Sequence, residues 1–184
     1  MLIEICPGKT WAATPCARTN LCHVNQDHLR GIKICCLDFM LNPAPVLLAE
    51  SDPCDILLLR RAFDRARISN PLIVVRNGQQ AIDYLAREGV FADRHKYPWP
   101  CLMLLDLKMP LVDGTQVLAW RKEHHHNGGL PIIVLTSLAS PAKIQEIMDL
   151  GAADYRFKPM DFDGLVLMAQ ELRFSWLEKP VLSA

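Results

Sequence analysis

Four short groups of polar residues each follow directly on an apolar run of this 184-residue chain. Their carboxylates, hydroxyls and ammonium are groups that proteins use to bind phosphate and divalent cations. Crowded carboxylates raise one another's pKa unless a cation lies between them, because two unit charges about 4 Å apart interact by about 4 kcal/mol at an effective dielectric constant of 20. The groups are Glu50-Ser51-Asp52, Asp106, Thr136-Ser137 and Lys158-Pro159.

These residue types predict phosphoryl chemistry on a carboxylate. In that chemistry Asp106 is the nucleophile, Lys158 and a metal ion neutralise the phosphoryl oxygens, and Thr136 donates a hydrogen bond to one of them. Magnesium suits such oxygen ligands better than zinc, since no His or Cys belongs to the four groups. The chain has no Walker loop or other glycine-rich nucleotide-binding loop. We therefore expect the phosphoryl donor to be another protein or a small phosphodonor.

The segments that must position these groups form a regular pattern from Pro45 onward, in which short apolar runs alternate with helical stripes. Near-continuous apolar strands that alternate with helices predict an α/β fold, a doubly wound parallel sheet with helices on both faces. The carboxyl ends of parallel strands meet at one edge, and ligands bind there. We expect five strands, at Val46–Ala49, Leu72–Val75, Cys101–Leu105, Ile132–Leu135 and Tyr155–Phe157.

Three segments, in this order along the chain, resemble the receiver domain of two-component response regulators. They read MLLDLKMPLVDG over Met103–Gly114, VLTS over Val134–Ser137 and GAADYRFKP over Gly151–Pro159. More narrowly, the segment Gly89–Pro100 and the ending Phe174–Leu177 resemble the small stand-alone receivers that serve bacteriophytochrome-type kinases. The resemblance implies a flavodoxin-like fold with strand order 2-1-3-4-5.

The resemblance also implies a role for each matching residue. Asp106 is then the phosphorylated aspartate, and Thr136 and Lys158 are the hydroxyl and the ammonium that respond to it. Tyr155 is then the aromatic residue whose rotamer follows Thr136. The same resemblance implies a cis peptide bond between Lys158 and Pro159.

Magnesium is the cofactor that the resemblance implies, and one position departs from the family at its binding site. Asp106, the backbone carbonyl of Lys108 and, through water, Glu50 are the expected ligands. The family has two adjacent acids after the first strand, whereas here Ser51 follows Glu50. Asp52 stands one residue too late and is a good candidate for a helix N-cap before Pro53. Losing one anionic ligand weakens metal binding by at least roughly tenfold.

The leading hypothesis is a single-domain response regulator that accepts a phosphoryl group on Asp106 from a sensor histidine kinase or a phosphotransfer protein. It signals by contact with an output protein and is not an enzyme with turnover, and the last helices could also join two copies as a homodimer. The alternative is a receiver-like interaction module that acts without phosphorylation because Ser51 has weakened the metal site. A phosphatase that uses the same aspartate is disfavoured, since its second aspartate would stand at Lys108.

The charge balance bears on which partners are expected. Lys and Arg total 20, as do Asp and Glu, so neither a nucleic acid nor a membrane surface is an expected partner. We expect a cytoplasmic protein. Residues 1–44 form an irregular or disordered leader that the native protein could lack, 45–179 are the receiver domain, and 180–184 are a tail.

Overall fold

A computed structural model of the chain describes residues 43–124, 129–137 and 139–178, all within one compact unit. Apart from residues 43 and 44, the expected leader lies outside the described residues, and so does the expected tail. The proposed domain boundaries therefore stay predictions. Within the described ranges, no helix is long and apolar enough to cross a membrane.

The sheet has five strands in the order β2-β1-β3-β4-β5, and every neighbouring pair is parallel. This confirms the predicted doubly wound sheet and its strand order. The third strand begins and ends one residue later than predicted, at Leu102–Asp106 instead of Cys101–Leu105, so that Asp106 is its last residue and pairs with Leu135. The strands are β1 (Val46–Ala49), β2 (Leu72–Val75), β3 (Leu102–Asp106), β4 (Ile132–Thr136) and β5 (Asp154–Phe157).

The α-helices follow the strands and begin at the capping residues that the sequence offers. Asp52 accepts hydrogen bonds from the backbone N–H groups of Cys54 and Asp55, which confirms it as the N-cap of the first described helix, and Pro53 opens that helix. The α-helices are α2 (Pro53–Arg65), α3 (Gly78–Ala86), α4 (Gly114–His124), α5 (Pro141–Asp149) and α6 (Phe162–Leu172). A short 3-10 helix, η2, covers Gly89–Ala92, and a π-helical turn, η3, covers Arg173–Leu177.

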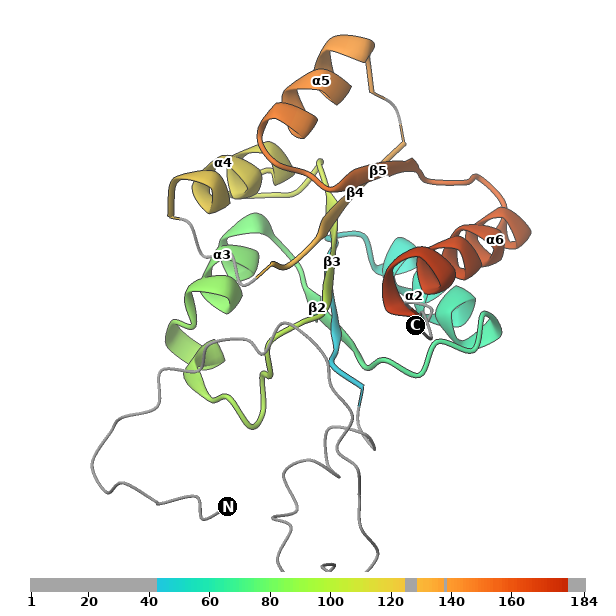
Figure 1. The fold of residues 1–184 in the computed structure, drawn as a ribbon, viewed down its shortest axis with the longest axis horizontal. Coiled ribbons are helices and arrows are strands. Elements are labelled where there is room, and N and C mark those ends of the chain that lie inside the picture. The colour runs from blue at the N-terminus through green and yellow to red at the C-terminus, as the bar shows by residue number, and fades with distance from the viewer. Residues whose placement is uncertain (1–42, 125–128, 138, 179–184) are drawn as a thin grey trace, which may run out of the picture. The chain divides into compact units, whose positions relative to one another are not determined.

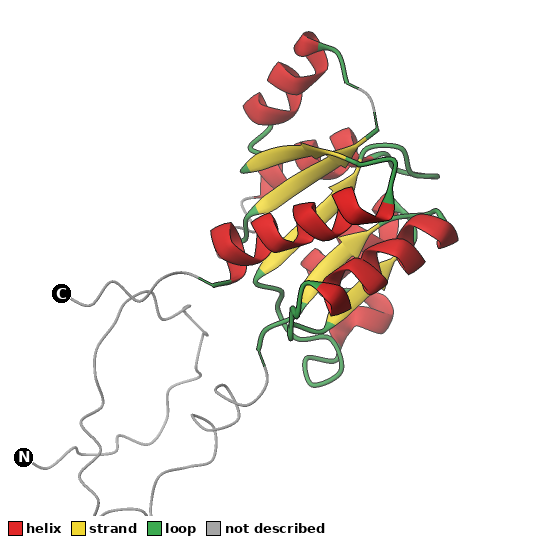
Figure 2. Ribbon diagram, turned by 90° about the vertical axis from the view of Figure 1, so that its right-hand side faces the viewer, coloured by secondary structure: helices red, strands yellow, loops and turns green. Residues whose placement is uncertain are grey.

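The helices cover both faces of the sheet. In Figure 1, α3 and α4 lie on one side of the strands, and α2 and α6 lie on the other. Figure 2 views the molecule from the side of α2 and α6, which lie in front of the strands. The three helices α3, α4 and α5 share a core cluster, because Ala81, Val117 and Ile147 are all buried in it.

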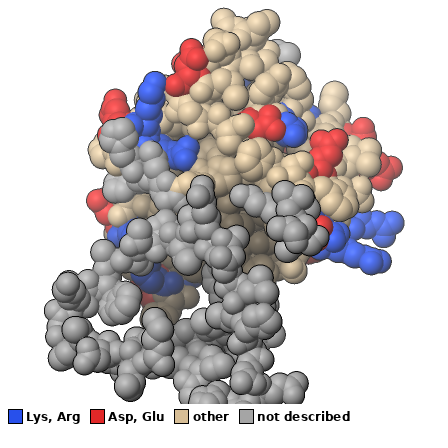
Figure 3. Space-filling model, viewed as in Figure 1, with Lys and Arg blue, Asp and Glu red and all other residues tan. Residues whose placement is uncertain are grey.

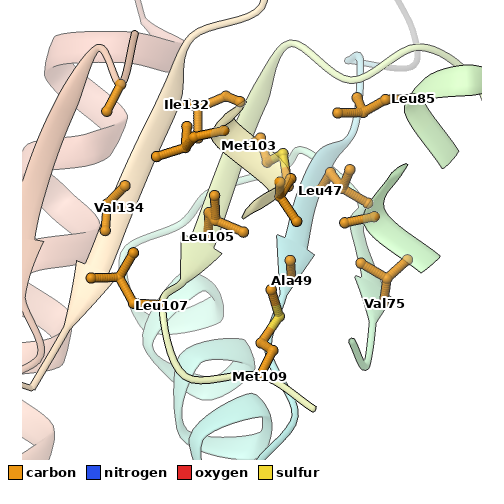
Figure 4. Packing of buried hydrophobic residues seen from close by; sticks show 14 of the residues in the cluster. Leu47, Ala49, Val75, Leu85, Met103, Leu105, Leu107, Met109, Ile132 and Val134 are labelled. Atoms are coloured by element: carbon orange, nitrogen blue, oxygen red, sulfur yellow. The ribbon is translucent and has the colours of Figure 1, made fainter. Parts of the chain in front are cut away.

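Alternate residues of each central strand belong to different cores. In β1, Leu47 and Ala49 contribute to the cluster under α3, α4 and α5, whereas Val46 and Leu48 contribute to the cluster under α2 and α6. Figure 4 shows the first of these clusters, where side chains from β1, β3 and β4 lie side by side. Because both faces are buried, these strands are apolar throughout, and polar groups collect only where the strands end.

A core substitution tests this two-sided packing. Leu104 in β3 is fully buried in the cluster under α2 and α6, whereas half of Leu57 on α2 is exposed. Leu104→Ala is expected to lower the free energy of unfolding by about 2 to 5 kcal/mol through lost burial and the cavity left behind. Leu57→Ala is expected to change it by less than about 1 kcal/mol. Urea unfolding followed by circular dichroism measures both, and equal losses would contradict the packing described.

Candidate functional site

A pocket lies at the carboxyl edge of the sheet, where the parallel strands bring their last residues together. Its walls come from the ends of β1, β3, β4 and β5 and from the start of α2. The lining residues are Glu50, Ser51, Asp52, Asp55, Asp106, Lys108, Thr136, Ser137 and Lys158. The structure thus gathers all the predicted site residues except Tyr155, which does not line the pocket.

Asp106 is held from two sides. Asp106 as a whole residue is 6% exposed, and its Oδ2 accepts a hydrogen bond of 3.0 Å from the backbone N–H of Lys108. Its other oxygen, Oδ1, lies 3.1 Å from Nζ of Lys158. The loop after β3 packs closely, since a Cβ on Gly114 would come within 2.4 Å of the Asp106 carbonyl oxygen. The Asp106 carboxylate therefore has a fixed backbone position and a cation beside it.

Lys158 connects the strand ends electrostatically. Its backbone N–H donates to the carbonyl oxygen of Thr136 at 2.8 Å, which anchors it beside β4. Its ammonium lies 2.5 Å from Glu50 Oε2 and 2.9 Å from Asp55 Oδ2, in addition to Asp106. Burial disfavours the charged form, but the hydrogen bonds to Glu50 and Asp55 and the charge of Asp106 outweigh it and raise the pKa of Lys158. The ammonium thus stays protonated at neutral pH.

Glu50 is the most deeply buried acid of the site, with 1% of its surface exposed. Burial raises the pKa of Glu50, while the hydrogen bonds from Lys158 and from the backbone N–H of Asp52 oppose that rise. The Asp52 N–H donates to Oε1 at 3.0 Å, and this bond fixes the direction of the carboxylate. The charged form of Glu50 is therefore stabilised by Lys158, as the crowding of acids in the sequence predicts.

The hydroxyl residues of the site come from two strands. Thr136 is buried at the end of β4, Ser137 after it is exposed, and Ser51 after β1 is half-buried. All three line the pocket. A neutral hydroxyl therefore occupies the pocket wall beside Glu50 where an acid was expected.

Two expectations from the resemblance end differently. The peptide bond between Lys158 and Pro159 is trans, so the prediction of a cis bond is wrong for this structure. The trans form is intrinsically favoured by about 0.5 to 1 kcal/mol, and with it the ammonium already reaches its carboxylates. Tyr155 is half-buried in β5, and its ring packs edge-on against Phe157 at 5.7 Å. Its coupling to Thr136 stays a prediction.

Asp55 is the site residue that the sequence reasoning missed. It lies in the first turn of α2, outside the four groups that follow apolar runs. The available signal was an acid three residues after the N-cap, a position that is one helical turn from the end of β1. That pattern alone indicates only a favourable interaction with the helix dipole.

The donor set fits a hard divalent cation. Carboxylate and hydroxyl oxygens line the pocket, and no His or Cys is among the lining residues. Among the described residues, no three His, Cys, Asp or Glu side chains are arranged as a ready-made metal cage. Magnesium binds through one or two carboxylates and keeps several waters. Glu50, Asp106 and the Lys108 carbonyl are the groups available to hold it.

The fold is of the flavodoxin-like class, with a pocket lined by carboxylates, hydroxyls and an ammonium at the carboxyl edge of its sheet. Residues 46–170 match the family model of the response regulator receiver domain, and the chain belongs to that family. Proteins of this family are signalling proteins, their partners are sensor histidine kinases or phosphotransfer proteins, and they bind Mg²⁺.

Individual relatives support the assignment over nearly their whole length. The chain is 30% identical to the response regulator Rcp1 of Synechocystis sp. over 142 residues, which cover 77% of this chain and 95% of Rcp1. The phosphorylated cyanobacterial phytochrome response regulator RcpA superposes with a TM-score of 0.68 at 28% identity and covers 77% of this chain and 99% of its own. The Mn²⁺-bound form of Rcp1 gives 0.67 at 30% identity, with 77% and 100% covered.

Removing the ammonium tests the electrostatics of the site. Lys158→Gln is expected to lower the free energy of unfolding by about 3 to 5 kcal/mol at pH 7, because buried carboxylates lose their cation. Glu50 then loses a hydrogen bond that lowers its pKa, so the folded variant binds more protons than the unfolded chain. The difference in the free energy of unfolding between the wild-type chain and Lys158→Gln, which is the deficit of the variant, therefore shrinks as the pH falls.

Urea unfolding at pH 7 and at about pH 5 measures this effect. Lys143→Gln is the matched control, because Lys143 forms an ion pair with Glu146 in which both side chains are about a third or more exposed. That substitution is expected to cost less than about 1 kcal/mol. A Lys158→Gln deficit that is equally large at both pH values would rule out the carboxylates as its cause.

Proposed function

We propose that this receiver is a single-domain response regulator that becomes phosphorylated on Asp106. The observation that carries the proposal is the Asp106 carboxylate at the end of β3, with the Lys158 ammonium 3.1 Å away and the Thr136 residue at the neighbouring strand end. The protein would act as a phospho-acceptor in signalling, without substrate turnover. The proposal places it in the cytoplasm, where a sensor histidine kinase draws on ATP.

The chemistry follows from the positions of these groups. A carboxylate oxygen of Asp106 attacks phosphorus, a new O–P bond forms, and the P–N bond to the donor histidine breaks, which returns the electron pair to the imidazole. The Lys158 ammonium pairs with a phosphoryl oxygen, and the Thr136 hydroxyl donates a hydrogen bond to another. A bound Mg²⁺ supplies further charge neutralisation of these oxygens. The groups that hold it would be Glu50, Asp106 and the Lys108 carbonyl, with Ser51 at the weakened ligand position.

Output through protein contact is the second part of the proposal. The last helical segment exposes large apolar side chains, since Leu167 on α6 and Phe174 on η3 are each more than half exposed. Basic and acidic side chains of the described residues are interspersed on the face shown in Figure 3, and no wide area there carries one sign. This supports a protein partner, or a second copy of the chain, over a nucleic acid. Tyr155 in β5 would transmit the change at Thr136 to that partner.

Phosphorylation is tested directly by incubation with acetyl phosphate and magnesium. Intact-mass spectrometry is expected to show one phosphate adduct on the wild-type chain and none on Asp106→Asn, because the amide is not a competent nucleophile. Ser175→Ala, outside the pocket, is a control expected to retain the adduct. If the wild-type chain shows no adduct even at high magnesium, the alternative of a phosphorylation-independent interaction module is favoured, since Ser51 would then have disabled the site.

Self-association through the last helical segment is tested by sedimentation equilibrium of the full chain. We expect a homodimer, and we expect Leu167→Ser with Phe174→Ser to weaken it at least tenfold by removing exposed apolar surface. Val90→Ser replaces a similarly exposed side chain in η2 and is expected to leave association unchanged. A monomeric wild-type chain would leave the apolar surface to the output protein and would contradict the dimer.

A further inference from the structure

Asp55 points into the phospho-acceptor pocket from a helix and not from a strand end. It lies in the first turn of α2, and its Oδ2 atom accepts a hydrogen bond of 2.9 Å from Lys158 Nζ. The same ammonium contacts Glu50 and Asp106. Three carboxylates from three different elements therefore surround one cation, and Asp55 is the most exposed of them, with 39% of its side chain accessible.

The charge of the pocket makes Asp55 significant. Without Asp55, the lining carries three negative charges and two positive charges, which leaves one net negative charge, too little to balance a divalent cation. The negative charges are those of Glu50, Asp52 and Asp106, and the positive charges are those of Lys108 and Lys158. Asp55 brings the net charge to minus two, the value that a second acid at position 51 would have given. The negative charge that Ser51 lacks is thus present in the pocket, because Asp55 supplies it from the first turn of α2.

A purely helical role for Asp55 does not account for its contacts. An acid in the first turn interacts favourably with the helix dipole wherever its side chain points. The capping function of this helix is already performed by Asp52, whose Oδ1 accepts from the N–H groups of Cys54 and Asp55. The Asp55 carboxylate turns instead toward Lys158 and the pocket.

We propose that Asp55 supplies the missing negative charge to the divalent-cation site, through its charge and through coordinated water, and so compensates for Ser51. Asp55 Oδ2 lies 2.9 Å and Asp106 Oδ1 lies 3.1 Å from the same Lys158 nitrogen. The two oxygens are therefore at most about 6 Å apart, and a cation bound about 2 Å from Asp106 Oδ1 would lie within about 8 Å of the Asp55 oxygen. At this separation a unit charge and a divalent cation attract each other appreciably even in water. The accessible side chain also leaves room for the waters that Mg²⁺ retains. This inference rests on the cation site of the proposed function.

Calorimetric titration of the full chain with Mg²⁺, and with Mn²⁺ as a second probe, tests the proposal. Asp55→Asn is expected to weaken binding by at least about tenfold, through the lost charge and the lost contact to coordinated water. Asp64→Asn is the matched control, because it removes the same charge from the exposed face of the same helix. It lies nine residues away, about 13 Å along the helix and beyond the screening length at physiological salt. Asp64→Asn is therefore expected to change the affinity for Mg²⁺ by less than twofold.

A second pair of variants keeps the test decisive if Asp55→Asn folds poorly, which thermal unfolding without metal would reveal. Ser51→Asp is expected to raise Mg²⁺ affinity at least tenfold, and Ser51→Asp with Asp55→Asn is expected to bind within about threefold of the wild-type chain. An Asp55→Asn affinity within twofold of wild type would overturn the proposal. So would a double variant that binds as tightly as Ser51→Asp alone.

The outcomes for the two proposals are separable. Metal binding that depends on Asp55, without a phosphate adduct on Asp106, would support this inference and contradict the proposed phospho-acceptor function. An adduct on Asp106, with metal binding that does not depend on Asp55, would support the proposed phospho-acceptor function and contradict this inference. A wild-type chain that binds neither Mg²⁺ nor Mn²⁺ would overturn the inference.

Discussion

The ammonium of Lys158, surrounded by carboxylates at the carboxyl edge of the sheet, is the interaction on which the site depends. Glu50 and Asp106 are almost completely buried, and each has an oxygen within 3.1 Å of the Lys158 nitrogen. Two buried anions this close together repel each other strongly unless a cation lies between them. Lys158 is that cation in the structure, and its raised pKa follows from the same contacts. The site is therefore a cluster of carboxylates that the Lys158 ammonium holds together.

The parallel sheet makes this cluster possible. Its central strands are buried on both faces, so a charged side chain within them would have no water and no partner. In these central strands charges are tolerated only where the strands end, and parallel strands all end at the same edge. The packing of α2 and α6 on one face and of α3 and α4 on the other therefore fixes where the chemistry takes place. Gly114 shows how tightly the elements fit there, because a Cβ would collide with the carbonyl of Asp106.

Near Ser51, the negative charges of the pocket come from different parts of the chain. Membership of the family fixes a fold and a carboxylate at the end of the third strand, but it does not fix which residue supplies each negative charge. Here Glu50 belongs to a strand end and Asp55 to a helix, and both reach the same ammonium. Site chemistry in this fold is thus better judged from the charges that surround Lys158 than from the identity of one position.

The sequence by itself determined the five strands, their parallel arrangement and the edge where Asp106, Thr136 and Lys158 meet. This was possible because short strands that are apolar throughout must be buried on both faces, and a parallel sheet covered by helices provides that burial. Only the tertiary structure decided that Asp55 belongs to the site, because this depends on the rotation of α2 against the sheet and on a side-chain rotamer. The same holds for the trans bond after Lys158, since the local preference between the two isomers is small and the packing of distant segments selects between them.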